Sequence, residues 1–285
     1  MAKVRVVTDS TAYVPEHLLR ELDITVVPLV VNIGDESFKE GTKYSNKEYY
    51  EKLYSFPVWP RTSQPSAGDF ALAFQKLADE GAGSIVCILI SSGISGTVFS
   101  AETAKGMLPN LDITIIDSLC TGSALGAMAV EAAKSAKAGG SRDDVIDVVN
   151  YVKDNLNLFF MVDSFECLKR GGRASGVQAV LGTLLQIKPI LHFDQQGMIT
   201  VFEKVRTRGK ALARILDIFA DQAGRNPNLE ISIMHVQAPD RAAELAQMVR
   251  ERHLGAGDIW IVDLGPVIGT HIGPGTLALC FYPRP

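Results

Sequence analysis

Short β-branched, apolar segments alternate with helical patterns through the first half of this sequence, and this alternation restricts the folds open to the chain. The predicted strands are residues 4–8, 25–31, 84–90 and 112–116. The predicted helices are residues 15–22, 45–54, 66–80, 97–107, 121–138 and 141–155. Strands that alternate with helices are typical of a parallel sheet covered by helices on both faces. The sequence therefore predicts an α/β fold with a mainly parallel sheet in this half.

The pattern changes near residue 157. Residues 188–193 and 198–203 flank the turn sequence Asp194-Gln195-Gln196-Gly197 and predict an antiparallel hairpin. Three further strands are predicted near residues 230–235, 258–263 and 276–282, with helices at 208–223 and 239–252. We therefore predict two lobes, an N-terminal α/β lobe of residues 1–157 and a smaller C-terminal α/β lobe of residues 158–285 whose sheet is mixed or antiparallel.

The composition excludes several classes of protein. Hydrophobic residues make up 47% and charged residues 21% of the 285 residues, as in an ordinary globular protein with an ample core. The net charge of −4 argues against nucleic acid as a partner, because such proteins need a basic face. No apolar run reaches the roughly eighteen residues of a membrane span. A strand is predicted almost directly after Met1, which leaves no room for a signal peptide, so a cytoplasmic protein is expected.

Metal and cofactor chemistry is not indicated. The four cysteines are far apart in the sequence, without a CxxC pair, and most have apolar neighbours, so each is expected to be a small buried side chain. The five histidines show no spacing typical of metal ligands. We therefore predict no metal site and no cofactor.

Hydroxyl and glycine residues gather in two segments that precede predicted helices. They are Arg61-Thr62-Ser63-Gln64-Pro65-Ser66 and Ser91-Ser92-Gly93-Ile94-Ser95-Gly96-Thr97. Hydroxyls and free backbone N–H groups at a helix start form an anion site without a metal. Ligands of open α/β sheets bind at the carboxyl ends of the strands, where the loops beginning at Asp9, Ser91 and Asp117 are expected. The sequence therefore predicts a carboxylate or phosphate site in a cleft shared by the two lobes.

Two other kinds of site stay open at this stage. Gly93-Ile94-Ser95-Gly96 approaches the nucleophile elbow of serine hydrolases, although Thr97 replaces the final glycine. A catalytic triad of Ser95 would then need His271 and either Asp9 or Asp117. A phosphate- or nucleotide-binding protein could use the same helix starts. Residues 273–278 match G-x-G-x-x-A, but no helix and second strand can follow them, so a Rossmann site is not predicted.

One histidine and two basic segments are further candidates. His271 lies in a glycine-rich segment that is predicted to be a loop, where a protonated imidazole would donate a charge-assisted hydrogen bond to a carboxylate. Arg173 follows two glycines in residues 169–173, which predicts a tight, exposed loop that presents the guanidinium. A second basic segment covers residues 204–208 and includes Arg206. Such arginines suit phosphate or the acidic surface of a partner.

Taken in order, several blocks across the whole chain resemble the DegV family, the fatty-acid-binding subunits of bacterial fatty acid kinase systems. The blocks are Val6-Val7-Thr8-Asp9-Ser10-Thr11, Thr62-Ser63-Gln64-Pro65-Ser66, residues 91–97, Asp117-Ser118, Leu168-Lys169-Arg170-Gly171-Gly172-Arg173 and His271-Ile272-Gly273-Pro274-Gly275. The resemblance implies two α/β lobes with a long-chain fatty acid, such as palmitate, stearate or oleate, buried between them. One departure is Ala174, where the family commonly has a larger aliphatic residue.

The resemblance also implies roles for individual residues. Thr62, Ser95 and Gly96 match positions that hold the acyl carboxylate, and His271 matches a histidine of the same region. Arg173 and Arg206 match arginines associated with docking of the kinase subunit or with phosphoryl transfer. The kinase phosphorylates the bound carboxylate, and the acyl-phosphate enters phospholipid synthesis.

A lipid carrier of this kind has no turnover of its own. The sequence leaves the oligomeric state open, with a monomer as the default, and we expect no membrane span but transient membrane contact. Burial of about fourteen methylenes at roughly 0.8 kcal/mol each provides about 11 kcal/mol before the costs of binding. The hydroxyls, the helix-start N–H groups and one histidine are therefore expected to hold the carboxylate without a buried lysine or arginine.

Overall fold

A computed structural model describes residues 3–178, 187–224, 226, 228–252 and 259–285 of the chain. Its first part contains a four-stranded parallel sheet with the strand order β2-β1-β6-β7. These strands are β1 (Lys3–Asp9), β2 (Thr25–Val27), β6 (Ala82–Leu89) and β7 (Ile113–Asp117). The predicted parallel α/β sheet is therefore confirmed.

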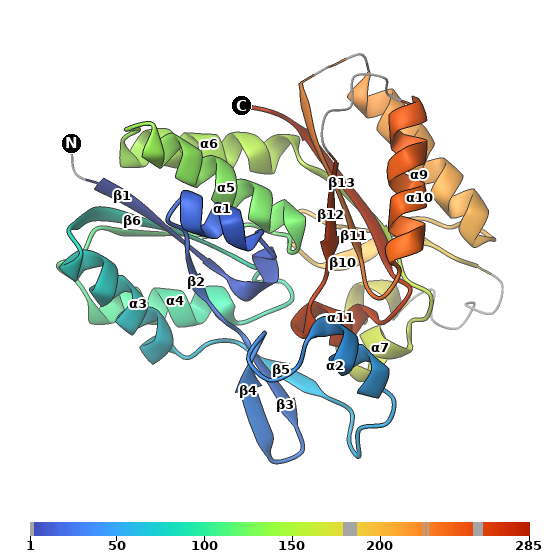
Figure 1. Cartoon of the computed structure of the whole chain (residues 1–285), viewed down its shortest axis with the longest axis horizontal. Helices are drawn as coiled ribbons and strands as arrows, with labels where there is room; N and C mark the ends of the chain where they lie inside the picture. The colour runs from blue at the N-terminus through green and yellow to red at the C-terminus, as the bar shows by residue number, and fades with distance from the viewer. Residues whose placement is uncertain (1–2, 179–186, 225, 227, 253–258) are drawn as a thin grey trace.

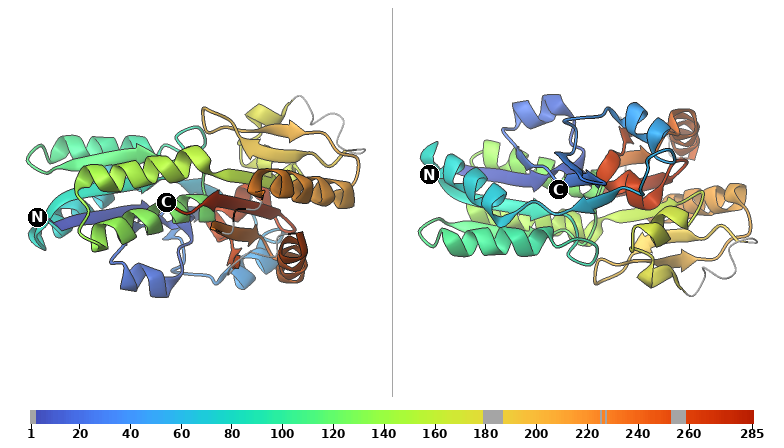
Figure 2. Two further views of the ribbon diagram at one scale, coloured as in Figure 1. Left: turned by 90° about the horizontal axis from the view of Figure 1, so that it is seen from above. Right: turned by 90° about the horizontal axis from the view of Figure 1, so that it is seen from below.

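Helices cover both faces of this sheet (Figures 1 and 2). Val7, Cys87 and Leu89 pack with the helices on one face, whereas Val6 and Val86 pack with those on the other. Such alternation is expected of strands that are buried on both faces. The first face carries α3 (Ala67–Asp79) and α4 (Thr97–Met107), and the second carries α5 (Ser123–Lys137) and α6 (Arg142–Asn155).

A six-stranded mixed sheet occupies the later part of the chain, in the order β10-β9-β8-β13-β11-β12. Its strands are β8 (Asn157–Met161), β9 (Ile190–Phe193), β10 (Ile199–Glu203), β11 (Leu229–His235), β12 (Ile259–Asp263) and β13 (Leu277–Pro283). Only β11 and β12 run parallel, and β9 and β10 form the predicted hairpin. The predicted mixed sheet is therefore confirmed. The predicted division into residues 1–157 and 158–285 stays a prediction.

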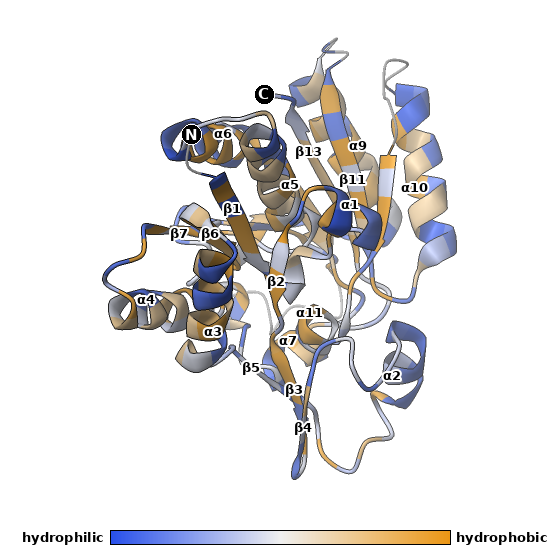
Figure 3. Cartoon of the chain, turned by 60° about the vertical axis from the view of Figure 1, so that its left-hand side comes forward, coloured by the Kyte–Doolittle hydropathy of each residue, from blue (hydrophilic) through white to orange (hydrophobic). Residues whose placement is uncertain are grey.

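Helix α5 packs between the two sheets, since it contacts β1 and β6 of the first and β11 of the second. Residues 123–133 are all buried, which explains why this segment is alanine-rich around its whole circumference. On the far face of the six-stranded sheet lie α9 (Arg208–Ala223) and α10 (Pro239–Arg252). Their outward surfaces are hydrophilic, whereas the strands beneath them are largely hydrophobic (Figure 3).

A third, three-stranded antiparallel sheet was not predicted from the sequence. It has the order β4-β3-β5 and consists of β3 (Val30–Ile33), β4 (Glu36–Lys39) and β5 (Arg61–Ser63). Helix α2 (Asn46–Lys52) lies between β4 and β5 in the sequence. The prediction of one strand over residues 25–31 is wrong, because this segment supplies β2 to the first sheet and β3 to the third. Pro28 lies between them and has no N–H to continue a strand ladder.

The glycine-rich segment around His271 is a helix and not the predicted loop. Helix α11 (Pro266–Ile272) packs against α2, β3, β5 and α7 (Glu166–Arg170). A Cβ atom at Gly269 would lie 1.9 Å from the Tyr50 hydroxyl oxygen, so a glycine here lets α11 approach α2 closely. The remaining elements are α1 (Glu16–Glu21) and the short 3₁₀ helices η1 (Ser10–Ala12) and η2 (Ser175–Val177). Among the described residues, no helix is long and apolar enough to cross a membrane.

Candidate functional site

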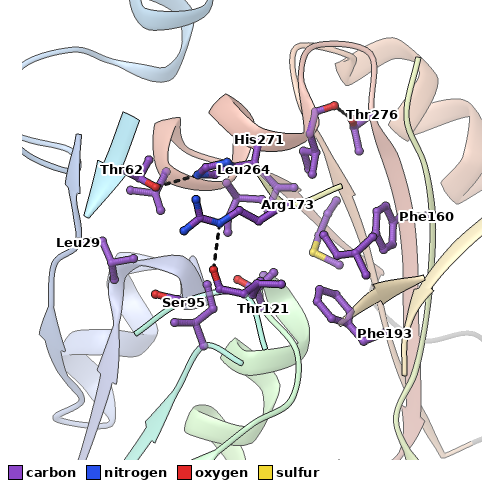
Figure 4. A pocket seen from close by; sticks show the side chains of 18 of the residues that line it. Leu29, Thr62, Ser95, Thr121, Phe160, Arg173, Phe193, Leu264, His271 and Thr276 are labelled. Atoms are coloured by element: carbon purple, nitrogen blue, oxygen red, sulfur yellow. Dashed lines mark hydrogen bonds between the residues drawn. The ribbon is translucent and has the colours of Figure 1, made fainter. Parts of the chain in front are cut away.

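A cavity of about 860 Å³, counting the part that opens to solvent, lies where the three sheets meet. The lining residues come from both halves of the chain: Leu29, Thr62, Ser63, Gln64, Ile90, Ile94, Ser95, Thr121, Gly122, Leu158, Phe160, Arg173, Phe193, Ile199, Met234, Leu264, Val267, Ile268, His271, Ile272, Thr276 and Ala278. Figure 4 shows Thr62, Arg173 and His271 on one side and the rings of Phe160 and Phe193 on the other.

Thr62 and His271 form the centre of the polar side. The Thr62 hydroxyl oxygen on β5 lies 2.7 Å from Nε2 of His271 on α11 (Figure 4). Burial, together with the positive charge of Arg173, lowers the pKa of His271 to about 3, although the Gly171 backbone acts against this shift. His271 is therefore neutral at pH 7 in this structure, and the protonated imidazole that the sequence predicts beside a carboxylate stays a prediction.

Ser95 and Gly96 lie in the turn that leads into α4. The Ser95 hydroxyl lines the cavity and lies 2.8 Å from the hydroxyl oxygen of Thr97. Gly96 is the N-cap of α4 and has no side chain to close the helix start. A Cβ atom at Gly96 would lie 2.3 Å from Oε1 of Gln64, so the glycine lets the two hydroxyl-rich segments come together. The structure thus brings Thr62, Ser95 and His271 to one cavity, whereas Gly96, which follows Ser95, is not among its lining residues.

Arg173 is also a cavity residue, and the prediction that it is presented by an exposed loop is wrong. Its Nε donates to the Ile94 carbonyl at 3.1 Å, and its Nη1 donates to the Gly171 carbonyl at 2.8 Å. Partial burial of the guanidinium lowers the pKa of Arg173. Arg173 thus lines the same cavity as His271, and the expectation that the carboxylate is held without a buried arginine stays a prediction.

Arg206 lies apart from this group. It is exposed in the segment between β10 and α9 and does not line the cavity. The two arginines that the sequence places in one role therefore differ in position, one inside the cavity and one on the surface.

The aspartates expected to face the cleft have structural roles instead. Buried Asp9 accepts hydrogen bonds from the N–H and hydroxyl of Thr11 and from the N–H of Ile90, and burial raises its pKa to about 6. Asp117 accepts from the backbone N–H groups of Ser92 and Leu119. Neither lines the cavity, and Ser95 and His271 are hydrogen-bonded to different residues, so the geometry does not assemble the triad of a serine hydrolase.

The opposite side of the cavity is apolar. Phe160 of β8 and Phe193 of β9 have ring centroids 6.0 Å apart, and Leu158, Met234 and Ala278 extend this surface across the six-stranded sheet. These apolar residues were not predicted from the sequence. Thr121 and Thr276, which also line the cavity, were not predicted either. Thr121 follows the carboxyl end of β7, so its position after a strand of the parallel sheet was the available signal.

The structure offers no site for a metal ion within its described parts. There, no three side chains of His, Cys, Asp or Glu form a group that could hold one. Cys87, Cys120, Cys167 and Cys280 are all buried and free, as predicted from their apolar neighbours.

Comparison with known proteins gives consistent results along the whole chain. A family model described as "Uncharacterised protein, DegV family" matches residues 3–284. A DegV domain-containing protein of Halalkalibacterium halodurans is 40% identical over 282 residues, covering 99% of each chain. Protein DegV of Bacillus subtilis is 36% identical, covering 98% of each chain.

Solved structures agree with this result. The structure of DegV from Bacillus subtilis, described as a fatty acid binding protein, superposes with a TM-score of 0.92 at 35% identity over 100% of both chains. A DegV family protein from Thermus thermophilus, described by its fatty acid binding, has a TM-score of 0.92 at 32% identity over 99% of both chains. The order of the blocks, the fold and these matches together show that this chain belongs to the DegV family.

Proposed function

We propose that this protein binds a long-chain fatty acid, with the carboxylate beside Thr62, Ser95, His271 and Arg173 and the acyl chain against the six-stranded sheet. The observation that carries this proposal is the division of one cavity into a polar side and an apolar side. The fatty acid binding described for the relatives from Bacillus subtilis and Thermus thermophilus supports it.

The polar side suits a carboxylate better than a neutral group. The hydroxyls of Thr62 and Ser95 can each donate a hydrogen bond, and Arg173 supplies a positive charge in a partly buried place. A bound carboxylate raises the pKa of a neighbouring imidazole, so the ligand would offset the effect of Arg173 on His271. Gly96 leaves the start of α4 without a side-chain cap. The free N–H groups of this helix end therefore add a partial positive charge near the same segment.

Part of the polar side is accessible from the surface. Ser63 and Gln64 line the cavity and are exposed, whereas Phe160 and Ala278 at the apolar side are 5% exposed. A fatty acid in this orientation has its acyl chain enclosed and its head group near the surface, where a second protein can reach it.

This access underlies the second part of the proposal. The protein presents the carboxylate to a partner fatty acid kinase in the cytoplasm, and the resulting acyl-phosphate enters phospholipid synthesis. The protein acts as a carrier without independent turnover and makes transient membrane contact when it exchanges lipid. Arg206 contacts the kinase, because it is exposed and free of the cavity. Arg173 lies at the head group and takes part in phosphoryl transfer.

The direct test is to denature the purified protein, extract it with organic solvent and identify the lipid by mass spectrometry. We expect about one long-chain fatty acid for each protein chain. An empty extract, with no uptake when palmitate, stearate or oleate is added back, would reject fatty acid binding. For the kinase step, the loaded protein is incubated with ATP and a bacterial fatty acid kinase, and acyl-phosphate is measured as its hydroxamate. No product from a kinase that acts on a known carrier would reject the presenting role.

A further inference from the structure

Thr121 differs from the other hydroxyl residues of the cavity. Its side chain is 8% exposed, and its Oγ1 is buried without a hydrogen-bond partner. Thr62 and Ser95 are paired with His271 and Thr97, and Thr276 donates to backbone carbonyls of α11 and its C-terminal end. Ser63 accepts from Asn32. Among the cavity-lining residues that the structure describes, Thr121 thus carries the hydroxyl that is left for a ligand.

The surroundings of Thr121 make its unpaired hydroxyl costly. An ideal Cβ at the adjacent Gly122 would be close to Met234 Sδ and the Leu264 side chain, so the wall here is otherwise apolar. A plain hydrocarbon chain placed against Thr121 leaves this buried hydroxyl without a hydrogen bond. Leaving a buried polar group unpaired costs roughly 1–3 kcal/mol.

The start of α5, directly after Thr121, also favours an oxygen atom of a ligand at this part of the cavity. Gly122 is the N-cap of this fifteen-residue helix, and no side chain closes the helix start. The N–H of Ser123 has the thioether sulfur of Met234 as its partner at 3.1 Å, and thioether sulfur is a weak acceptor. A helix N-terminus favours an electronegative atom nearby.

We infer that Thr121 forms a second polar subsite for a fatty acid whose acyl chain carries an oxygen substituent, such as a hydroxyl group. Thr121 can donate to or accept from such a group, and the helix start favours its oxygen. The acyl carboxylate occupies the Thr62 and His271 side at the same time. This inference rests on the proposed function, because it assigns the class of fatty acid that the same cavity prefers.

The experiment compares dissociation constants for stearic acid and for its 2-, 3-, 10- and 12-hydroxy derivatives, measured with delipidated wild-type protein and with Thr121→Val. Valine keeps the shape of threonine and removes its hydroxyl. For the wild type, we expect at least one hydroxy acid to bind about tenfold more tightly than stearic acid. In T121V this preference should disappear, whereas stearic acid should bind about as tightly as it binds to the wild type, because the Thr121 hydroxyl is buried without a partner before the ligand arrives.

Thr121→Ser serves as the matched control, because it keeps the hydroxyl and loses only a methyl group, so it should retain the preference. If stearic acid binds but no hydroxy acid is preferred, or if T121V keeps the preference, the subsite is rejected while the proposed function stands. If neither stearic acid nor any hydroxy acid binds the wild type, the proposed function itself fails. A circular dichroism melt of both variants identifies any loss of folding, in which case the serine variant and the wild type decide the outcome.

Discussion

The Thr62 hydroxyl oxygen lies 2.7 Å from Nε2 of His271, although 209 residues separate the two along the chain. The contact joins β5 of the three-stranded sheet to α11, which precedes the last strand of the six-stranded sheet. Because His271 is neutral, this is a neutral hydrogen bond that an arriving carboxylate can replace with charge-assisted ones. The pair therefore joins two distant parts of the chain at the place where we propose that the head group binds.

The combined substitution Thr62→Ala and Ser95→Ala should reduce the fatty acid that copurifies with the protein. Each lost hydrogen bond to a carboxylate costs roughly 1.5–3 kcal/mol, so the dissociation constant for stearate should rise by about 100-fold or more. Titration with delipidated protein measures this change. Thr103→Ala, on the exposed surface of α4, is the control. An unchanged lipid load with cooperative melting would remove both residues from the carboxylate site.

Arg173→Ala and Arg206→Ala should have different effects on lipid binding. Arg173 lines the cavity, so its loss should weaken fatty acid binding by about tenfold or more, as expected for a hydrogen bond to a charged group. Arg206 is exposed and outside the cavity, so its variant should keep the wild-type affinity and lose acyl-phosphate formation with the kinase. Equal lipid affinity in the two variants would contradict this separation.

His271 should make the lipid-free protein less stable in acid. Its pKa is about 3 in the folded protein, compared with 6.5 for an unperturbed histidine. Between these values the unfolded chain binds a proton that the folded protein does not, so stability is lost as the pH falls below about 6.5. Urea unfolding at pH 7 and pH 5 should show a larger loss for the wild type than for His271→Gln. The same loss in both proteins would mean that His271 titrates normally in the fold.

Gly197→Ala should destabilise the protein more than Gly224→Ala does. Both glycines have positive φ, +69° and +56°, so each alanine costs about 1 kcal/mol in backbone strain. At Gly197 the new Cβ would also lie 2.0 Å from the Ser91 hydroxyl oxygen, whereas at Gly224 no atom lies within 4 Å. Steric overlap in a packed region adds typically 1–3 kcal/mol. Urea midpoints measure the difference, and equal midpoints would show that the β9–β10 turn moves away from Ser91 at little cost.

Much of the fold follows from local sequence signals. The predicted helices 97–107, 208–223 and 239–252 coincide with α4, α9 and α10. Ser45 and Glu48 form the capping box expected at the start of α2, since both of its reciprocal hydrogen bonds are present. These elements are specified by residues a few positions apart, so the sequence alone is sufficient to place them.

Helix α11, which was not predicted, depends on contacts between distant residues. Glycines in the segment 265–275 suggest a loop, but α11 forms because Gly269 fits against Tyr50 and Thr270 bonds to Tyr49. A signal for β3 and β4 was present in the two-residue turn Gly34-Asp35, which connects them. Helix α11 has Pro266 at its first position, which is a weaker signal of a helix start.

In the candidate site, too, some features could be predicted from local sequence and others depend on contacts between distant residues. The hydroxyl-rich segments could be recognised as helix starts from the sequence, and the structure places both at one cavity. The position of Arg173 could not be recognised, because the glycines before it are compatible with an exposed loop as well as with a turn into the cavity. Its hydrogen bond to the Ile94 carbonyl joins residues 79 positions apart, and no local pattern contains that information.

Strand β13 closes the chain, yet it lies in the interior of the six-stranded sheet between β8 and β11. During synthesis, β8 and β11 leave the ribosome before the strand that joins them, and their facing edges do not pair with it until β13 emerges. Ala278 on β13 and His271 just before it both line the cavity. A chain that is truncated before His271 therefore lacks both residues, and its cavity has an incomplete wall.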